Sequence, residues 1–325
     1  MEHNILQLIA QATAATTVER KALIQSLWSG YGEIARYQLT GGVVGCHVVV
    51  KSVVPPVQQH HPRGWNTDLS HQRKLQSYQV EMAWYKSWAL RCDYHCRVPD
   101  CYTVAALDEI GSCLLVLEDI DDAGFSVRKS ELNLLEIKLC LNWLAHFHSQ
   151  FLQQVPTDLW PVGCYWHLAT RPDELAAMDN RELQQAASEI DRRLSAAEFK
   201  TIVHGDAKLD NFCFADDGLS VAAVDFQYVG GGCGIKDVAY FFSSCLDEQQ
   251  CVRWENELLD YYFQQLTVAV SAKNDIDTGA LEKEWRELYA FAWADFYRFL
   301  NGWMPGHWKI NRYVQKLTAK VLKQL

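Results

Sequence analysis

The sequence contains no run of about 18 consecutive apolar residues, the length that a membrane-spanning helix requires. Its first residues, MEHNILQLIAQATAATTVER, lack the basic stretch and the apolar stretch of a secretory signal peptide. We therefore expect no membrane partner and a cytoplasmic location. Proline is scarce, with 8 residues in 325, while apolar residues make up 49%, which is the composition of a folded globular protein and not of a disordered one.

A positive net charge is also lacking. Lysine and arginine number 30 against 40 aspartates and glutamates, the formal charge is −10, and no segment forms a basic stripe. Binding to a phosphate backbone needs such a stripe, so we expect no nucleic-acid partner. The eleven cysteines are an odd number, and most stand singly in apolar runs, as small buried side chains do in a reducing compartment. The sequence leaves the oligomeric state open.

The character of the chain changes near residue 118. The first part predicts a helix or two and then a run of strands, with glycines at Gly30, Gly32, Gly41 and Gly42 that indicate tight turns between strands. The second part predicts mostly helices. We expect strands within 21–28, 33–40, 43–54, 101–107 and 112–118 and a helix over 69–91, then helices over 131–152, 173–199, 247–270, 279–302 and 309–325 with short strands at 201–203, 212–214 and 221–226. Two domains follow from this division, 1–118 and 119–325, joined by the acidic link at 118–122.

The most informative segment is IVHGDAKLDNFCF at 202–214, followed by VAAVDFQ at 221–227. Asp206, Asn211 and Asp225 follow one another along the chain, each at or near the end of a short apolar strand. Transfer of a phosphoryl group from ATP needs a carboxylate that takes the proton of the attacking hydroxyl. It also needs a carboxylate and an amide oxygen that hold Mg²⁺ against the phosphates. The segment supplies all three groups in order.

This segment resembles the H-G-D-x-x-x-x-N motif of the aminoglycoside phosphotransferase and choline kinase group, with D-F-Q where protein kinases have D-F-G. The passages LLVLEDI, VEMAWY and DFQ to DVAYFF are most similar to the ecdysteroid-kinase-like branch of that group. The resemblance implies an α+β, bilobal protein-kinase-like fold with a small antiparallel-sheet N-lobe and a larger helical C-lobe. It also implies ATP and Mg²⁺ as cofactors.

The resemblance assigns roles to single residues. It implies that Asp206 accepts or orients the proton of the acceptor hydroxyl and that Asn211 and Asp225 hold Mg²⁺. It implies that Lys51, at the end of the apolar run VVVK, contacts the α- and β-phosphates, and that Glu81 holds this lysine in place. A solvated edge lysine and a surface glutamate are the ordinary readings of these last two residues.

Other positions match the family less specifically. Lys208 either helps transfer near the γ-phosphate or is simply exposed. Gly30 and Gly32 either cover the triphosphate with backbone N–H groups or form a plain turn. Glu118 and Ile120 match the hinge whose backbone reads the adenine edge, although an acidic pair here also suits a solvated linker.

Three residues around the motif are expected to act on the loop itself. We expect the ring of His204 to hydrogen-bond and orient the loop and Asp237 to serve as a helix N-cap or a loop anchor. Gln227 replaces a glycine, so a backbone flip of the D-F-Q segment is disfavoured.

The acceptor is less defined than the donor. The segment between Asp225 and Asp237 is short and no A-P-E sequence follows, which favours a small-molecule hydroxyl acceptor over a peptide. An amino alcohol, an aminoglycoside-like molecule and an apolar alcohol all remain open. The tryptophan-rich stretch 284–313, with Asp295 in it, either lines the acceptor pocket or packs the core. The alternatives are a non-catalytic nucleotide-binding protein with a kinase-like fold and, opposed by the short segment, a protein kinase.

Overall fold

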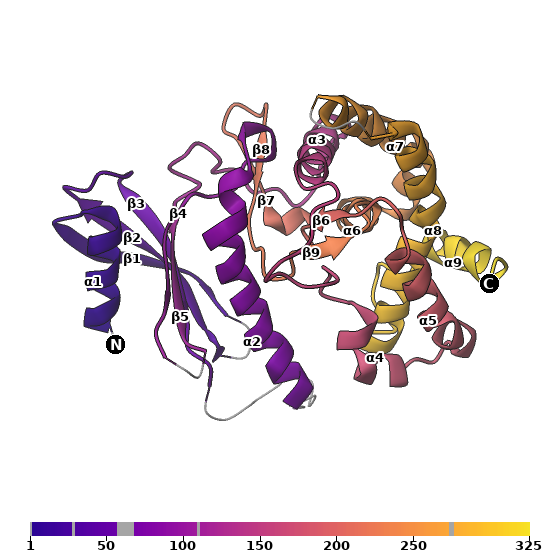
Figure 1. Ribbon diagram of the computed structural model, residues 1–325, viewed down its shortest axis with the longest axis horizontal. Coiled ribbons are helices and arrows are strands. Elements are labelled where there is room, and N and C mark those ends of the chain that lie inside the picture. Colours follow the sequence, from indigo (N-terminus) through magenta and orange to yellow (C-terminus); the bar gives the residue numbers. More distant parts are fainter. Residues whose placement is uncertain (1, 28–29, 57–67, 109–110, 273–275) are drawn as a thin grey trace. The chain divides into compact units, whose positions relative to one another are not determined.

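The computed structural model describes residues 2–27, 30–56, 68–108, 111–272 and 276–325 (Figure 1). Its residues group into two compact units, which we call unit 1 and unit 2. Unit 1 comprises Met1–Asp93, Arg97–Arg128 and Cys213–Gln227, and unit 2 comprises Tyr94–Cys96, Lys129–Phe212 and Tyr228–Leu325. The division into domains at residue 118 stays a prediction.

Unit 1 is built on a five-stranded antiparallel sheet with the order β1-β2-β3-β5-β4 (Figure 1). The strands are β1 (Thr17–Ser26), β2 (Gly32–Thr40), β3 (His47–Val53), β4 (Cys101–Ala106) and β5 (Cys113–Glu118). All five overlap the segments that the sequence predicts as strands. β1 begins four residues before its predicted segment and β2 one residue before, while the other three lie within theirs. The hairpin between β2 and β3 contains Gly41 and Gly42, as expected.

The two faces of this sheet are covered differently. Val48 and Val50 of β3 pack in a buried cluster with Ile9 of the N-terminal helix α1 (Glu2–Thr13). Lys51, the next residue, points to the opposite face because side chains alternate along a strand. There it meets α2 (Asp68–Ala83), which continues as a π-helical turn, Trp84–Trp88, and a 3₁₀ turn, Ala89–Arg91. The predicted helix over 69–91 is thus confirmed, with a changed winding in its last two turns.

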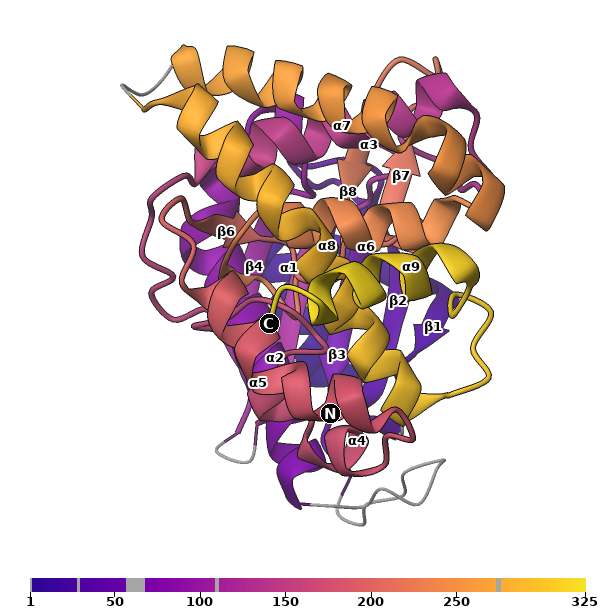
Figure 2. The same cartoon turned by 90° about the vertical axis from the view of Figure 1, so that its right-hand side faces the viewer.

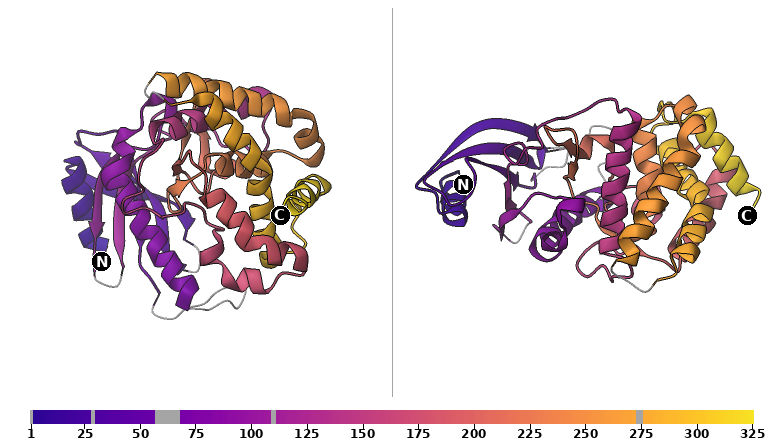
Figure 3. Two further views of the ribbon diagram at one scale, coloured as in Figure 1. Left: turned by 45° about the vertical axis from the view of Figure 1, so that its right-hand side comes forward. Right: turned by 90° about the horizontal axis from the view of Figure 1, so that it is seen from above.

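Unit 2 is helical. Its helices are α3 (Leu134–Gln150), α4 (Pro172–Ala176), α5 (Arg181–Ser195), α6 (Ile235–Cys245), α7 (Glu248–Ser271), α8 (Thr278–Trp303) and α9 (Arg312–Leu322). α3 and α7 run side by side, and α8 contacts α5, α6 and α9 (Figures 2 and 3). α3 and α7 each begin with a capping box, formed by Asn133 and Glu136 and by Asp247 and Gln250. The last helix begins at Arg312 and not at 309, because Asn311 caps it.

Short strands carry the motif segments. β6 (Thr201–Val203) pairs with β9 (Gly230–Gly232), and β7 (Phe212–Phe214) pairs with β8 (Val221–Ala223). β8 ends three residues before the end of its predicted segment. The D-F-Q segment therefore leaves the hairpin at Val224 and is held by side chains instead of by strand pairing.

Two further observations concern the whole of the described chain. No helix among the described residues is both long enough and apolar enough to cross a membrane. Among the cysteines, all of which lie in the described part, Cys46 is exposed, whereas the others are buried or half-buried.

Candidate functional site

Unit 1 brings together three of the predicted residues. The Nζ of Lys51 lies 2.6 Å from Oε2 of Glu81 and 3.6 Å from Oδ1 of Asp225. β3 supplies the lysine, α2 the glutamate, and the segment after β8 the aspartate. Lys51 and Glu81 are 3% and 2% exposed, so neither is the solvated surface charge that is its ordinary reading.

Electrostatics hold this lysine in its charged form. Burial by itself lowers the pKa of Lys51, but the negative charges of Glu81 and Asp225 outweigh it, and the pKa is raised above its usual value. The lysine thus stays protonated although it is buried. Its partner Asp225 is one-third exposed, so the positive charge lies close to solvent on the side of Asp225. Such a group can neutralise phosphate oxygens.

Asp225 has an unusual backbone conformation. Its φ is +68°, the left-handed region that costs a non-glycine residue about 1 kcal/mol. Phe226 stacks on Trp84 with ring centroids 4.5 Å apart, and Gln227 hydrogen-bonds Asp225 with its side chain. The surrounding side chains therefore fix a conformation that the backbone alone would disfavour.

The two glycines predicted to cover the triphosphate differ in their surroundings. Gly32 has a φ of +126°, and a Cβ there would lie 2.0 Å from the carbonyl oxygen of Ser52, so no other residue fits next to β3. Gly30 also has a positive φ, +76°, but a Cβ there would meet no atom within 4 Å. Glycine is therefore favoured at position 30 by its positive φ, and not by a lack of space for a side chain. Their role toward a nucleotide stays a prediction.

The predicted hinge residues are tied into unit 1. The N–H of Glu118 donates to the carbonyl of Asp100, and the N–H of Phe125 donates to the carbonyl of Ile120. Ile120 is buried in a small apolar cluster with Cys213. These bonds give the segment one fixed shape, but they use the N–H of Glu118, so its role in adenine recognition stays a prediction.

Unit 2 holds the H-G-D segment by a buried carboxylate. Asp237 of α6 accepts hydrogen bonds from the N–H of His204 at 2.6 Å and from the N–H of Gly205 at 3.0 Å. Nε2 of His148 lies 3.1 Å from the same carboxylate, and its Nδ1 lies 2.8 Å from the hydroxyl of Tyr262. Asp237 is therefore the loop anchor, while the N-cap of α6 is Gly234, which makes no side-chain cap bond.

Gly205 is required by its position in this loop. Its φ is +76°, and a Cβ would lie 2.1 Å from the carbonyl oxygen of Tyr228. Nδ1 of His204 lies 3.3 Å from the N–H of Asp206, which places the imidazole in the loop-orienting role that the sequence predicts. The tight loop directs Asp206 out of the strand β6 in one defined conformation.

Asp206, Asn211 and Lys208 meet in unit 2. Nδ2 of Asn211 donates to the carbonyl of Asp206 at 2.8 Å and to its Oδ2 at 3.1 Å, and Nζ of Lys208 lies 3.2 Å from the same Oδ2. Asp206 is 6% exposed. Both bonds of Asn211 use its N–H groups, which leaves its carbonyl oxygen suited to a hard cation such as Mg²⁺.

Sequence reasoning missed three residues around Asp206. Burial raises the pKa of Tyr240 well above its usual value, and a hydrogen bond from its hydroxyl to Asp206 adds to this shift. Tyr165 hydrogen-bonds Tyr240 in turn. The Nζ of Lys309 lies 5.2 Å from the ring centroid of Tyr240, and burial lowers its pKa to about 8 although the charge of Asp206 opposes this. These residues come from the loop before α4, from α6 and from the α8–α9 loop, so no local sequence pattern joins them.

The tryptophan-rich stretch 284–313 mostly packs the core. Trp285 is fully buried and donates its Nε1–H to the carbonyl of Phe199. Asp295 is 1% exposed and is already paired, with Arg298 at 2.7 Å and Lys236 at 3.4 Å. It is therefore not available to a cationic ligand. Trp308, which is 63% exposed, is the tryptophan of this stretch that faces solvent in the described chain.

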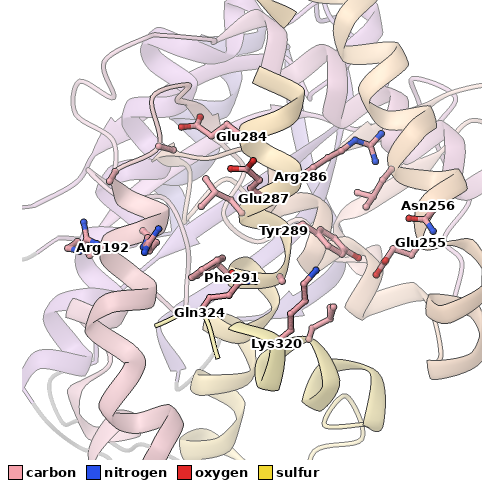
Figure 4. A pocket seen from close by; sticks show the side chains of 17 residues that line it. Arg192, Glu255, Asn256, Glu284, Arg286, Glu287, Tyr289, Phe291, Lys320 and Gln324 are labelled. Carbon is pink, nitrogen blue, oxygen red and sulfur yellow. The ribbon is translucent and has the colours of Figure 1, made fainter. Parts of the chain in front are cut away.

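A cavity elsewhere in unit 2 is lined by none of the predicted catalytic, cofactor-binding or metal-binding residues, although part of the stretch 284–313 contributes to its wall. It has a volume of about 770 Å³ and lies among α5, α7, α8 and α9 (Figure 4). Its wall mixes Arg192 and Lys320 with Glu255 and Glu287. Its carboxylates stand among cationic side chains, and none of the motif residues lines it, so we place the site at the motif residues and not here.

One group of side chains has the spacing of a metal site. Ligand atoms of His47, Asp119 and Asp122 lie within 4.8 Å of one another. However, Arg36 forms an ion pair with Asp119, and Nδ1 of His47 lies 2.9 Å from Asp122. The cluster is satisfied by its own protein partners, and we assign it a structural role between the β3 strand and the segment after β5.

Part of this chain is similar to a known protein family. The model of the ecdysteroid kinase-like family matches residues 165–275. The matched segment contains Asp206, Asn211 and Asp225, together with the anchor Asp237. A search of curated proteins gave no match. The match to the ecdysteroid kinase-like family confirms the resemblance that the motif residues carry.

Solved structures of the same fold span both units. A choline kinase from Cryptosporidium parvum has 9% identity and a TM-score of 0.56, covering 100% of this chain and 95% of its own. A protein from Ralstonia eutropha, provisionally named an aminoglycoside phosphotransferase, has 13% identity and a TM-score of 0.55, with coverages of 99% and 95%. An amicoumacin kinase solved with AMP-PNP, Ca²⁺ and amicoumacin has 13% identity and a TM-score of 0.51, with coverages of 99% and 92%. The α+β kinase-like fold is thereby confirmed; at this identity the likeness shows the fold alone.

Proposed function

We propose that the chain is an ATP- and Mg²⁺-dependent kinase that transfers the γ-phosphoryl group to a hydroxyl of a small molecule. The observation that carries the proposal is that the motif residues already contact one another within each unit. Unit 1 pairs Lys51 with Glu81 and Asp225, and unit 2 holds Asp206 against Asn211. The kinase names of the family and of the solved structures support the same chemistry.

The residues divide the work of the reaction. Asp206 accepts the proton of the acceptor hydroxyl as its oxygen forms a bond to the γ-phosphorus and the bond from that phosphorus to the β–γ bridging oxygen breaks, releasing ADP. Lys51, held charged by Glu81, offsets the negative charge of the phosphates. Oxygen atoms of Asp225 and Asn211 would hold Mg²⁺, which when bound neutralises and orients the phosphates. Both are oxygen donors, so the ligand set fits a hard cation.

The surroundings of Asp206 favour some acceptors over others. Lys208 and Lys309 both act on its charge, and Tyr240 hydrogen-bonds it. Choline and aminoglycosides, which appear in the names of two of the solved structures above, are cationic molecules. Two lysines beside the base would repel an ammonium group placed close to the reacting hydroxyl. We therefore favour an acceptor whose reacting end is a neutral alcohol.

Replacing the base tests the proposed function. Asp206→Asn keeps the size and hydrogen-bonding groups of the side chain but cannot accept the hydroxyl proton, so phosphorylation should fall by about 10³-fold. Labelled ATP with pooled small alcohols measures transfer, and a thermal-shift titration with Mg-ATP measures binding, which should stay as in the wild type. The matched control is Asp210→Asn, an exposed aspartate four residues along the chain.

Each outcome separates the candidate functions. Unchanged turnover in Asp206→Asn would contradict the assigned base. Label that enters a protein mixture but no small alcohol would indicate a protein kinase. Mg-ATP binding by the wild type without transfer to either pool would indicate a non-catalytic nucleotide-binding protein.

A further inference from the structure

The D-F-Q segment is attached to α2 and its continuation at more than one point. Phe226, which is fully buried, stacks on Trp84 at 4.5 Å and meets Tyr85 edge-on at 6.2 Å. Gln227, one residue further, reaches the same helix two turns earlier, at Lys74 and Ser77. All of these residues belong to unit 1. The segment is therefore fastened along the helix that also supplies Glu81.

The amide of Gln227 makes contacts at both of its ends. Its Oε1 accepts from Nζ of Lys74 at 2.8 Å and from Oγ of Ser77 at 3.3 Å. Its Nε2 donates to Oδ1 of Asp225 at 2.6 Å. Gln227 is 6% exposed, so water competes little for these bonds. An amide can donate and accept at once, whereas a glutamate carboxylate only accepts and an apolar side chain does neither.

Oδ1 of Asp225 is thereby held from two sides. Gln227 donates to it, and Lys51 lies 3.6 Å from it, while the backbone of Asp225 stays at a φ of +68°. A left-handed aspartate on a segment without strand pairing would otherwise have several conformations available. The chain Lys74–Gln227–Asp225 limits it to one.

We propose that Gln227 is a positioning residue, which ties the carboxylate of Asp225 to α2 and sets its orientation before the nucleotide binds. The proposal rests on the proposed function in naming Asp225 as a magnesium ligand. It explains why a glutamine stands at a position where a glycine would let the segment move. It also makes α2 a support of the metal ligand as well as of Lys51.

The test compares two Gln→Glu substitutions on the same protein. Gln227→Glu keeps the acceptor toward Lys74 and Ser77, loses the donor to Asp225 and adds a like charge beside it. Gln79→Glu makes the same chemical change on an exposed position of α2 and serves as the matched control. Gln227→Met, which has a similar length and neither polar group, is the second variant if the first fails to fold. Circular dichroism checks the fold of all three.

Two measurements are made on the full chain. Hydrogen exchange of peptides covering residues 224–228, without nucleotide, should be at least about tenfold faster in Gln227→Glu than in the wild type and Gln79→Glu. Calorimetric titration should show Mg-ATP binding weakened about tenfold in Gln227→Glu, a change of about 1.4 kcal/mol. Binding of ATP with EDTA should change less than twofold, because the metal ligand is not involved there. A loss of general packing would weaken both titrations alike.

The outcomes are separable. Unchanged exchange in both Gln227 variants would overturn the tether. Faster exchange with unchanged Mg-ATP affinity, or with equal losses in the presence and absence of Mg²⁺, would overturn the positioning of a metal ligand. A wild-type chain that binds no Mg-ATP would contradict the proposed function, while the exchange of the nucleotide-free protein would still decide whether Gln227 fixes the segment.

Discussion

The two units position their functional carboxylates by different means. In unit 1, Asp225 and Lys51 are held mainly by other side chains, through the ion pair with Glu81 and the amide of Gln227. In unit 2, the loop around Asp206 is held through its backbone, whose N–H groups donate to the buried Asp237. A side-chain network can be weakened one pair at a time, whereas a backbone anchor supports a whole loop. The comparison predicts different costs for single substitutions in the two units.

The largest effect is expected from the anchor of unit 2. Asp237→Ala leaves two backbone N–H groups and the ring of His148 without their shared acceptor in a buried place, and should lower the free energy of unfolding by about 3 to 5 kcal/mol. Urea denaturation followed by circular dichroism measures it. The control is Asp260→Ala, which removes an exposed ion pair with Arg286 and should cost less than about 1 kcal/mol. Equal costs for the two variants would show that unit 2 does not depend on this buried backbone anchor.

A smaller effect is expected from the buried pair of unit 1. Lys51→Met leaves Glu81 buried without its partner and should cost about 3 kcal/mol, whereas Lys51→Met with Glu81→Leu should recover much of this loss. A double-mutant cycle from urea denaturation measures the coupling. The exposed pair of Arg20 and Glu33 in the same sheet, changed in the same way, should couple by less than about 1 kcal/mol. Additive costs at Lys51 and Glu81 would show that unit 1 does not rely on this pair.

The smallest effect concerns protonation near Asp206 and needs no substitution. Burial lowers the pKa of Lys309 to about 8, so this amine should become reactive about two pH units below an ordinary lysine. The rate of labelling with an amine reagent, followed by peptide mass spectrometry from pH 6 to 11, should show a midpoint near 8. The same peptide in urea-denatured protein should show the ordinary midpoint near 10.4. Equal midpoints in the folded and the denatured protein would show that Lys309, near Asp206, is less buried than in the structure.

The sign of the accompanying stability change follows from the same pKa. Below about pH 8 Lys309 is protonated in both states and contributes nothing that depends on pH. Between about 8 and the ordinary lysine value the unfolded chain binds more protons, so the contribution of this group to folding stability rises with pH.

Residues that share a local motif could be found from the sequence. The strand before Asp206, the loop that follows it and the hairpin before Asp225 are defined by a few neighbouring residues, and the structure brings Lys51, Glu81 and Asp225 together as expected. The resemblance to the kinase family, together with the order of a strand lysine and a helix glutamate before the motif, indicated the pair. Long helices were also predictable, because α3, α7 and α8 carry both cap residues and regular apolar patterns.

Other features depend on contacts between distant segments. Lys309 and Tyr240 are 69 positions apart in the numbering of the chain, and nothing in either local sequence indicates that both lie near Asp206. The burial of Asp295 by Lys236 and Arg298 is of the same kind. The bonds of Gln227 to Lys74 could not be predicted either, since they depend on how the D-F-Q segment packs along α2. Packing between distant segments decides which partners these side chains have, and the apolar periodicity of the sequence does not show that packing.

The single exposed thiol gives this protein a site for selective chemical labelling. Burial raises the pKa of several enclosed cysteines, to about 12 for Cys113 and Cys251 and to about 11 for Cys213, so the thiolate form of these three is scarce at neutral pH. Cys46, on the turn between β2 and β3, is exposed to solvent. A maleimide dye should therefore attach there first, and its fluorescence would report from the sheet of unit 1 whenever a nucleotide is added.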